Sequence, residues 1–288
     1  MRIFVTGGTG FIGTHAVAEL AKRGHKLLVL SRRRTVLPGG CVLLRGDLAT
    51  FGRLEKQIKK FKPDAVLHLG WEGLPDIGPE MSLRNLLYGI DVVRLAVSVG
   101  AKKIVISGSM FEYGEAQGAI KEEDGPHPII PVSAAKTALR FIGQAMAKQS
   151  SIDFVWAIFF SVYGPGQKPH SLIPHLLERM RLGLALDVKN PGAANDFVYV
   201  TDVVRALALI LEKHKPGQND TYNVGSGKLT SVKDVVREIY GKEMIRTRVN
   251  PGYYADITRM KKEFGWKPKV GIKEGIRKTL KNESKTEQ

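Results

Sequence analysis

A glycine-rich turn near the amino terminus constrains the fold of this chain more than any other sequence feature. Residues 7–13 read Gly-Gly-Thr-Gly-Phe-Ile-Gly, directly after an apolar run at residues 2–6 and directly before a segment with helical spacing. Gly7 permits a tight turn, Gly10 lets the backbone approach a bound group, and Gly13 lets a helix pack closely on a strand. The pattern predicts a strand–turn–helix unit whose helix N-terminus offers free N–H groups to an anion.

The same strand and helix signals recur along the chain. Apolar runs that predict buried strands occupy residues 2–6, 26–30, 41–44, 65–69, 103–107 and 154–160. Helical patterns occupy residues 11–22, 54–60, 81–99, 133–148 and 201–213. Because strands that alternate with helices form βαβ crossovers, we expect an α/β fold with a doubly wound parallel (Rossmann) sheet and a smaller C-terminal α/β lobe.

The residues at the end of the second predicted strand indicate which anion binds. In such a unit the glycine turn holds the pyrophosphate of a dinucleotide, and the second strand ends beside the adenosine ribose. That strand is followed by Ser31, Arg32, Arg33 and Arg34 rather than by a carboxylate. A carboxylate would favour the 2′-hydroxyl of NAD(H), whereas guanidinium groups favour the 2′-phosphate of NADP(H). We therefore expect a nicotinamide dinucleotide site that prefers NADP(H), with NAD(H) as the alternative.

The sequence changes in texture after Val162, where a Tyr-Gly-Pro-Gly loop interrupts the alternation of strands and helices. We expect a dinucleotide-binding domain at residues 1–162 and 196–224, and a substrate-binding lobe at residues 163–195 and 225–288.

The charge and the cysteine content of the chain make several classes of binding site less favourable. Lysine and arginine number 44 against 28 aspartates and glutamates, a net charge of +16. The basic residues are scattered, which favours a solvated basic surface over a nucleic-acid site. The single cysteine, Cys41, excludes an internal disulfide and a cysteine metal cluster, so we expect no metal site. No signal-peptide pattern or long apolar stretch is present, and we expect a cytoplasmic protein without a membrane partner.

Seven further motifs follow the glycine turn in order. They are Gly46-Asp47-Leu48, His68-Leu69-Gly70-Trp71, and the segments at residues 107–114, 160–167, 196–203, 222–227 and 264–268. In this order they resemble the extended short-chain dehydrogenase/reductases, and more narrowly the NAD-dependent epimerase/dehydratase group that acts on sugar nucleotides. The resemblance runs from Met1 to about Pro268.

The resemblance implies two sets of binding residues. The cofactor residues would be Gly7, Thr9, Gly10, Phe11, Ile12, Gly13, Ser31, Arg32, Arg33, Asp47, Leu48, Leu69, Gly70, Trp71, Ser107, Lys136, Phe160 and Val162. Ser109, Gln167, His170 and Arg179 would contact a nucleotide-linked sugar. By the same resemblance Asp47 would contact the adenine, and Ser109 would be the active-site serine.

The catalytic segment departs from the family pattern. The family places a tyrosine four residues before the catalytic lysine, one helical turn away, where the phenol exchanges a proton during hydride transfer. Lys136 is present, but the tyrosine position holds Val132. The family's usual substrate-binding residues are also altered, by Asn195, Asn250 and Ser161.

Two interpretations follow. In the first, the chain is a 4-ketoreductase or epimerase with an atypical site, in which Tyr113, Ser109, Ser133, His127 or Lys136 moves the proton. In the second, it is a catalytically degenerate NADP(H)-binding module with a sensing or partner-binding role. A nucleic-acid-associated role is a weaker third possibility. The resemblance also predicts a homodimer, formed through the helices at residues 81–99 and 133–148, which are rich in apolar residues.

Overall fold

The computed structural model describes residues 1–218 and 220–286. The chain forms two compact units. The first comprises Met1–Glu115, Gly125–Ile158 and Val204–Tyr222, and the second comprises Ala116–Asp124, Phe159–Val203 and Asn223–Gln288. The predicted division of ligand-binding roles between two domains stays a prediction.

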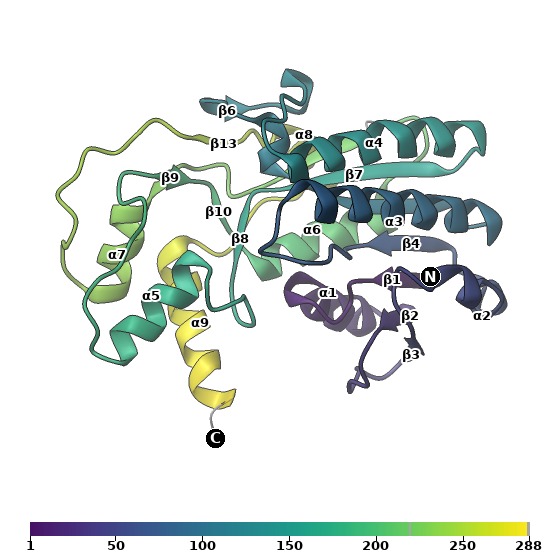
Figure 1. Cartoon of the computed structure of the whole chain (residues 1–288), viewed down its shortest axis with the longest axis horizontal. Helices are drawn as coiled ribbons and strands as arrows, with labels where there is room; N and C mark the ends of the chain where they lie inside the picture. Colours follow the sequence, from purple (N-terminus) through teal and green to yellow (C-terminus); the bar gives the residue numbers. More distant parts are fainter. Residues whose placement is uncertain (219, 287–288) are drawn as a thin grey trace. The chain divides into compact units, whose positions relative to one another are not determined.

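A seven-stranded sheet organises the fold, with strand order β11-β7-β5-β4-β1-β2-β3 (Figure 1). Its strands are β1 (Arg2–Thr6), β2 (Lys26–Ser31), β3 (Cys41–Arg45), β4 (Ala65–His68), β5 (Lys103–Ser109), β7 (Asp153–Phe159) and β11 (Thr221–Val224). The pairings from β3 through β5 are parallel. Strand order reverses between β1 and β4, which is where open α/β sheets leave a crevice for ligands. The expected Rossmann fold is confirmed.

Helices connect the strands. They are α1 (Phe11–Lys22), α2 (Glu55–Phe61), α3 (Pro79–Ser98), α4 (Pro131–Gln149) and α6 (Val200–Lys213), with 3₁₀ turns η1 (Phe51–Leu54) and η2 (Met110–Tyr113). Helices α3 and α4 lie side by side and both pack on β5 (Figure 1). Each begins with a proline, whose missing N–H is not needed in a first turn.

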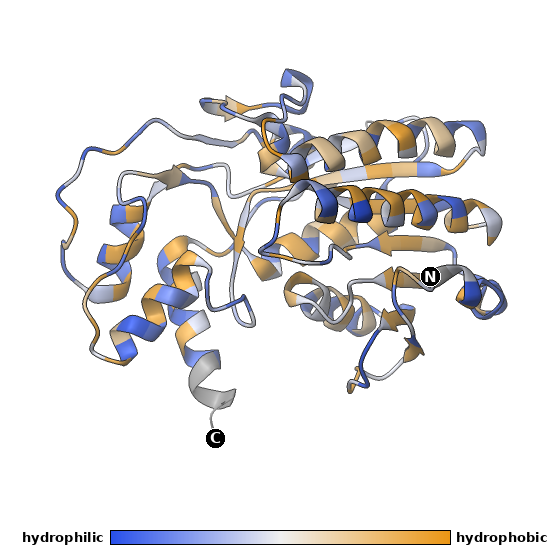
Figure 2. Ribbon diagram, viewed as in Figure 1, coloured by the Kyte–Doolittle hydropathy of each residue, from blue (hydrophilic) through white to orange (hydrophobic). Residues whose placement is uncertain are grey.

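The strands of the sheet are apolar because helices and neighbouring strands bury them. All four residues of β4 are buried, as are four of the five in β1. Figure 2 shows the strands predominantly in the colours of apolar residues. Each strand and helix predicted from the sequence is present, with ends shifted by at most two residues. The seventh strand, β11, was not predicted as a strand.

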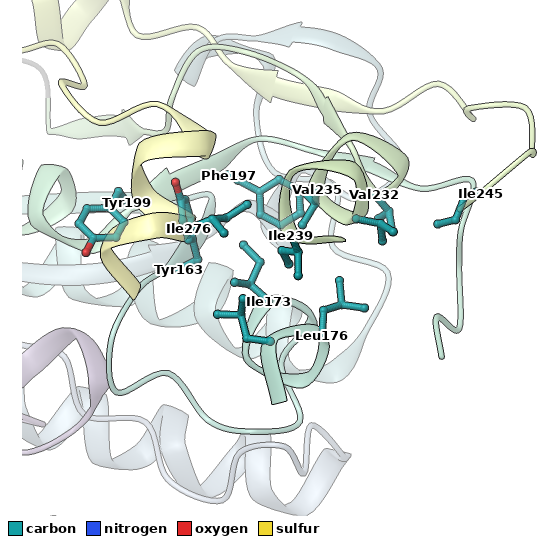
Figure 3. Close-up of a cluster of buried hydrophobic side chains, with 12 residues drawn as sticks. Tyr163, Ile173, Leu176, Phe197, Tyr199, Val232, Val235, Ile239, Ile245 and Ile276 are labelled. Carbon is teal, nitrogen blue, oxygen red and sulfur yellow. The ribbon is translucent and has the colours of Figure 1, made fainter. Parts of the chain in front are cut away.

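The second unit has its own elements and its own core. Its strands are β6 (Gly118–Ile120), β8 (Ser161–Tyr163), β9 (Ala194–Asn195), β10 (Phe197–Tyr199), β12 (Thr230–Ser231) and β13 (Tyr253–Ala255). Its helices are η3 (Glu122–Asp124), α5 (Leu172–Arg181), α7 (Val232–Tyr240), α8 (Thr258–Phe264) and α9 (Ile272–Thr286). Residues from α5, α7, α9 and β10 form one buried apolar cluster, which includes Leu176, Val235, Ile276 and Phe197 (Figure 3).

Two buried aspartates form hydrogen bonds with segments of this unit that are distant in the sequence. Oδ1 of Asp196 accepts a hydrogen bond from the N–H of Ser226 (2.6 Å), and its Oδ2 accepts from Gly227 and Ala255 (both 3.0 Å). Oδ2 of Asp202 accepts from the backbone of residues 269 and 270 (both 2.9 Å). These carboxylates satisfy buried N–H groups, so the family motif at residues 196–203 has a structural role here.

Candidate dinucleotide and active site

The glycine turn between β1 and α1 leaves no room for a side chain at Gly7 or Gly13. Gly7 has φ +70°, and a Cβ there would lie 2.5 Å from the backbone nitrogen of Gly70. A Cβ at Gly13 would overlap the backbone oxygen of Gly7. The N–H of Gly10 donates to that same oxygen (3.0 Å), and Gly10 precedes the first residue of α1. The turn therefore presents bare backbone and a helix N-terminus to the crevice beside β1.

A pocket of about 230 Å³ opens at this turn. It is lined by Gly7, Thr9, Gly10, Leu30, Ser31, Arg32, Gly46, Asp47, Leu48, Leu69, Gly70, Trp71 and Glu72. Ten of these thirteen are residues that the sequence analysis assigns to the cofactor. The segments come from the ends of four adjacent strands, β3, β2, β1 and β4, which meet at one edge of the sheet. Leu30, Gly46 and Glu72 were missed, although each directly adjoins a predicted residue.

The predicted ribose end of the pocket is lined by Ser31 and Arg32. The hydroxyl of Ser31 donates to the backbone oxygen of Arg33 (2.9 Å). Nη1 of Arg32 lies 3.4 Å from Oε1 of Glu72, an ion pair that the sequence did not reveal. Ser31 is paired in register with Arg45 on β3, which brings another basic residue to this edge.

Asp47 is held as a carboxylate at the β3 side of the pocket. Its Oδ1 accepts hydrogen bonds from the N–H and the hydroxyl of Thr50, both 2.7 Å. The hydroxyl bond is the main reason that the pKa of Asp47 lies below its ordinary value. The side chain is therefore ionised and fixed in direction.

Lys136 lies on α4 and is 8% exposed. Its Nζ donates to the backbone oxygen of Ser107 (2.8 Å) and lies 4.2 Å from the centre of the Trp71 ring. Burial lowers the pKa of Lys136 to about 8, and the charge of Glu112 opposes that shift. The structure thus brings together three predicted site residues, from β5, α4 and the loop after β4.

Ser109 ends β5 and begins η2. Its backbone N–H donates to Oε1 of Glu112 (2.7 Å), and its hydroxyl accepts from the N–H of Phe111 (3.4 Å). Glu112 is fully buried and also accepts from Nε1 of Trp156 (3.0 Å). Burial raises the pKa of Glu112, and its bonds and the nearby charges of Lys136 and Arg140 oppose that rise. Glu112, which holds Ser109 in place, was not among the predicted site residues.

The other residues proposed for proton transfer are buried or form hydrogen bonds with the backbone. Tyr113 is 3% exposed. The hydroxyl of Ser133 donates to the backbone oxygen of Ile130 (2.8 Å) at the start of α4. The backbone N–H of His127 donates to the backbone oxygen of Glu112 (2.7 Å). Val132, in the first turn of α4, is 6% exposed.

His68, at the end of β4, is buried in the sheet. Its Nδ1 lies 2.6 Å from the hydroxyl of Thr6 on β1, and burial lowers the pKa of His68 to about 3. The nearby charge of Lys136 lowers that pKa further. His68 is therefore a neutral residue that joins two strands.

Phe11 and Ile12, also predicted cofactor residues, begin α1 in the first unit. The other predicted residues lie in the second unit. They are Phe160, Val162, Gln167, His170 and Arg179. Nε2 of Gln167 donates to the backbone oxygen of Val162 (3.0 Å), and Nε of Arg179 donates to Ala185 (2.6 Å). Both side chains thus take part in local loop structure within that unit.

A sequence profile of the NAD dependent epimerase/dehydratase family matches residues 3–225. The chain belongs to the NAD-dependent epimerase/dehydratase family. The matched region begins at β1 and ends directly after β11, so it spans the whole seven-stranded sheet of this family member.

Relatives of this epimerase/dehydratase family member match it along nearly its whole length. A dTDP-glucose 4,6-dehydratase of Haemophilus influenzae is 24% identical, over 98% of this chain and 97% of that protein. The structure of a UDP-glucose 4-epimerase from Thermotoga maritima, with UDP-glucose, is 28% identical with a TM-score of 0.86 and full coverage of both chains. A UDP-glucose 4-epimerase from Thermus thermophilus, in complex with NAD, is 28% identical with a TM-score of 0.84 and 98% coverage of each chain.

The site of this family member fits a dinucleotide in two respects. The turn holds Gly7 in a conformation that side chains rarely adopt, and Gly10 brings backbone without a side chain to the N-terminus of α1, as a bound pyrophosphate requires. Nε1 of Trp71 is buried and has no hydrogen-bond partner among the described residues. An unpaired buried donor is costly, and a ligand acceptor beside the ring would satisfy it.

Within residues 1–218 and 220–286, no cluster of three histidine, cysteine or acidic side chains could hold a metal ion. In the described part of the chain, no helix has the length and apolarity needed to cross a membrane.

Proposed function

We propose that this family member is an NAD(P)-dependent oxidoreductase or epimerase that acts on a nucleotide-linked sugar. The observation that carries the proposal is the glycine-turn pocket together with Lys136 and Ser109 in the same unit. The known activities of the relatives, which are named for UDP-glucose and dTDP-glucose, support this substrate class.

The cofactor would lie along the edge where β3, β2, β1 and β4 end. Gly7, Gly10 and the start of α1 would bind its pyrophosphate, and Asp47 its adenine. We further propose that Ser31, Arg32 and Arg33 favour NADP(H), because guanidinium groups pair with a 2′-phosphate. Arg45, in register with Ser31, adds positive charge at this edge. The solved relative from Thermus thermophilus binds NAD, so NAD(H) is the alternative.

A binding titration tests the cofactor proposal. We expect the protein to bind NADPH more tightly than NADH, and Arg32→Ala and Arg33→Ala to weaken NADPH binding selectively. Equal affinity for the two cofactors in the unmodified protein would refute the preference, and no binding of either would refute the site itself.

The chemistry would use Lys136 and Ser109. When bound, the nicotinamide ring supplies reversible hydride exchange with a sugar carbon. The hydroxyl of Ser109 would donate to the reacting sugar oxygen, and Nζ of Lys136 would hold the cofactor ribose. Val132 has no proton to exchange. Among the candidates that replace a phenol, Lys136 has a pKa near neutral pH, which suits a general acid.

Turnover measurements test the enzymatic proposal. The protein would be incubated with NADPH and 4-keto nucleotide sugars, and with UDP- and dTDP-linked hexoses, and the products identified. We expect slow reduction or epimerisation that Lys136→Met abolishes and Val132→Tyr accelerates. Tight NADPH binding without any turnover would refute the enzymatic proposal.

The second candidate function is a degenerate NADP(H)-binding module, and Val132 is the observation that favours it. Lys136 would then serve only to bind the cofactor ribose. Activity that appears in Val132→Tyr, and is absent from the unmodified protein, would support this candidate. Gln167, His170 and Arg179 would be residual substrate-lobe residues in that case.

We also propose that the protein forms a homodimer through α3 and α4. These helices expose several large apolar side chains, which are Leu83 (57%), Leu87 (54%), Phe141 (52%) and Ile142 (40%). Exposed apolar groups gathered on adjoining helices are typical of an interface. Light scattering should give twice the chain mass, and Leu87→Glu should give a monomer. A monomeric unmodified protein would refute the proposal.

A further inference from the structure

Arg32 and Glu72 approach each other from opposite sides of the glycine turn. Arg32 follows β2 and Glu72 follows β4, and these strands are the two neighbours of β1. Their ion pair, with Nη1 and Oε1 3.4 Å apart, therefore spans the end of β1, where the turn begins. Both residues line the dinucleotide pocket.

The two partners differ in how firmly they are held. The backbone N–H of Glu72 donates to Oδ1 of Asn85 (2.7 Å), and its backbone oxygen accepts from Nδ2 of the same residue (3.1 Å). Asn85 is 2% exposed on α3. The side chain of Glu72 is 22% exposed, whereas that of Arg32 is 70% exposed. Glu72 is thus the anchored partner, and Arg32 is the one that can change partners.

The charges that line the pocket make this pair relevant to the cofactor. The lining includes Arg32, Asp47 and Glu72, one cation and two carboxylates. A cofactor with a free 2′-hydroxyl leaves the pair between Arg32 and Glu72 intact. A 2′-phosphate competes with Glu72 for the positive charge and the N–H groups of Arg32.

We propose that Glu72 is a specificity-determining residue of the dinucleotide site, which holds Arg32 as its counterion and so reduces the affinity gained from a 2′-phosphate. This inference rests on the proposed cofactor site. It predicts that the competition of Glu72 for Arg32 limits the NADP(H) preference that the arginines after β2 provide.

The test is a double-mutant cycle on cofactor affinity. Dissociation constants for NADPH and NADH would be measured for the unmodified protein, Glu72→Gln, Arg32→Gln and the double variant. We expect Glu72→Gln to raise the ratio of NADPH to NADH affinity about two- to fivefold, the range of an exposed ion pair. Because the pair is exposed, the effect should shrink as salt is raised.

The cycle separates this inference from its alternatives. Glu80→Gln, an exposed carboxylate at the start of α3 that does not line the pocket, should leave the ratio unchanged. The effect of Glu72→Gln should disappear in the Arg32→Gln background, because Glu72 acts through Arg32. An unchanged ratio in Glu72→Gln, or a full shift without Arg32, would overturn the role of Glu72 alone. Failure of the unmodified protein to bind either cofactor would overturn the proposed function as well.

Discussion

The ammonium group of Lys136 lies 4.2 Å from the centre of the Trp71 ring and donates to the backbone oxygen of Ser107. The face of an indole attracts a cation, and the carbonyl attracts its protons. Burial acts against both contacts by disfavouring the charged form, and it prevails, since the pKa of Lys136 falls to about 8. The lysine therefore changes charge close to neutral pH.

This balance predicts how stability depends on pH. In the unfolded chain the lysine has its ordinary pKa of 10.5, so between about pH 8 and 10.5 the unfolded state binds more protons than the folded state. Stability consequently rises with pH in that window. Between pH 7.5 and 9.5 the unmodified protein should gain about 2 kcal/mol of unfolding free energy relative to Lys136→Met. Urea unfolding of both proteins measures this difference, and a difference independent of pH would contradict the shifted pKa.

His68 predicts a loss of stability at the acidic end of the pH profile. Its pKa of about 3 in the folded protein lies below the ordinary value of 6.5, so the folded state resists protonation. The stability from the neutral ring is fully present above pH 6.5 and is lost as pH falls towards 3. From pH 7 to 4.5 the unmodified protein should lose about 2 kcal/mol more than His68→Asn, whose amide oxygen can still meet Thr6. Parallel acid profiles of the two proteins would rule out the buried neutral histidine.

Local sequence patterns predicted most of the sheet and most of the lining of the pocket at the glycine turn. The glycine turn was predictable because its close backbone geometry depends on residues 7–13, which are consecutive. Strand β11 was missed because Thr221–Val224 is only four residues long and contains two polar residues. It is buried by its pairing with β7, a neighbour that lies far away in the sequence.

The missed site residues share a physical cause. Glu72 and Glu112 act through partners that lie 40 and 44 positions away, Arg32 and Trp156. Ser133 was a candidate proton donor by residue type, but its hydroxyl donates to Ile130. Such roles depend on which strands are neighbours and which side chains are buried. Neither property is encoded in a short motif.

The network around Asp196 predicts a large loss of stability in the second unit. Asp196→Ala would leave the N–H groups of Ser226, Gly227 and Ala255 without their acceptor. Buried donors that lose a partner cost about 1–3 kcal/mol each before relaxation, so we expect a net loss of about 3 kcal/mol. Urea unfolding measures it. Asp187→Ala, at a carboxylate that is 59% exposed, should change stability by less than about 0.5 kcal/mol. Similar values for the two variants would mean that the Asp196 network is not important for stability.

The close approach of α1 to the glycine turn predicts a loss of both stability and cofactor binding when one Cβ is added. In Gly13→Ala the new methyl group would overlap the backbone oxygen of Gly7, so the helix or the turn must move. Overpacking of this kind costs about 1–3 kcal/mol. Gly39→Ala is the matched control, because a Cβ at Gly39 would meet no atom within 4 Å. Thermal unfolding and NADPH titration should show both losses in Gly13→Ala and neither in the control. If Gly13→Ala bound NADPH with unchanged affinity, the turn would not be the pyrophosphate site.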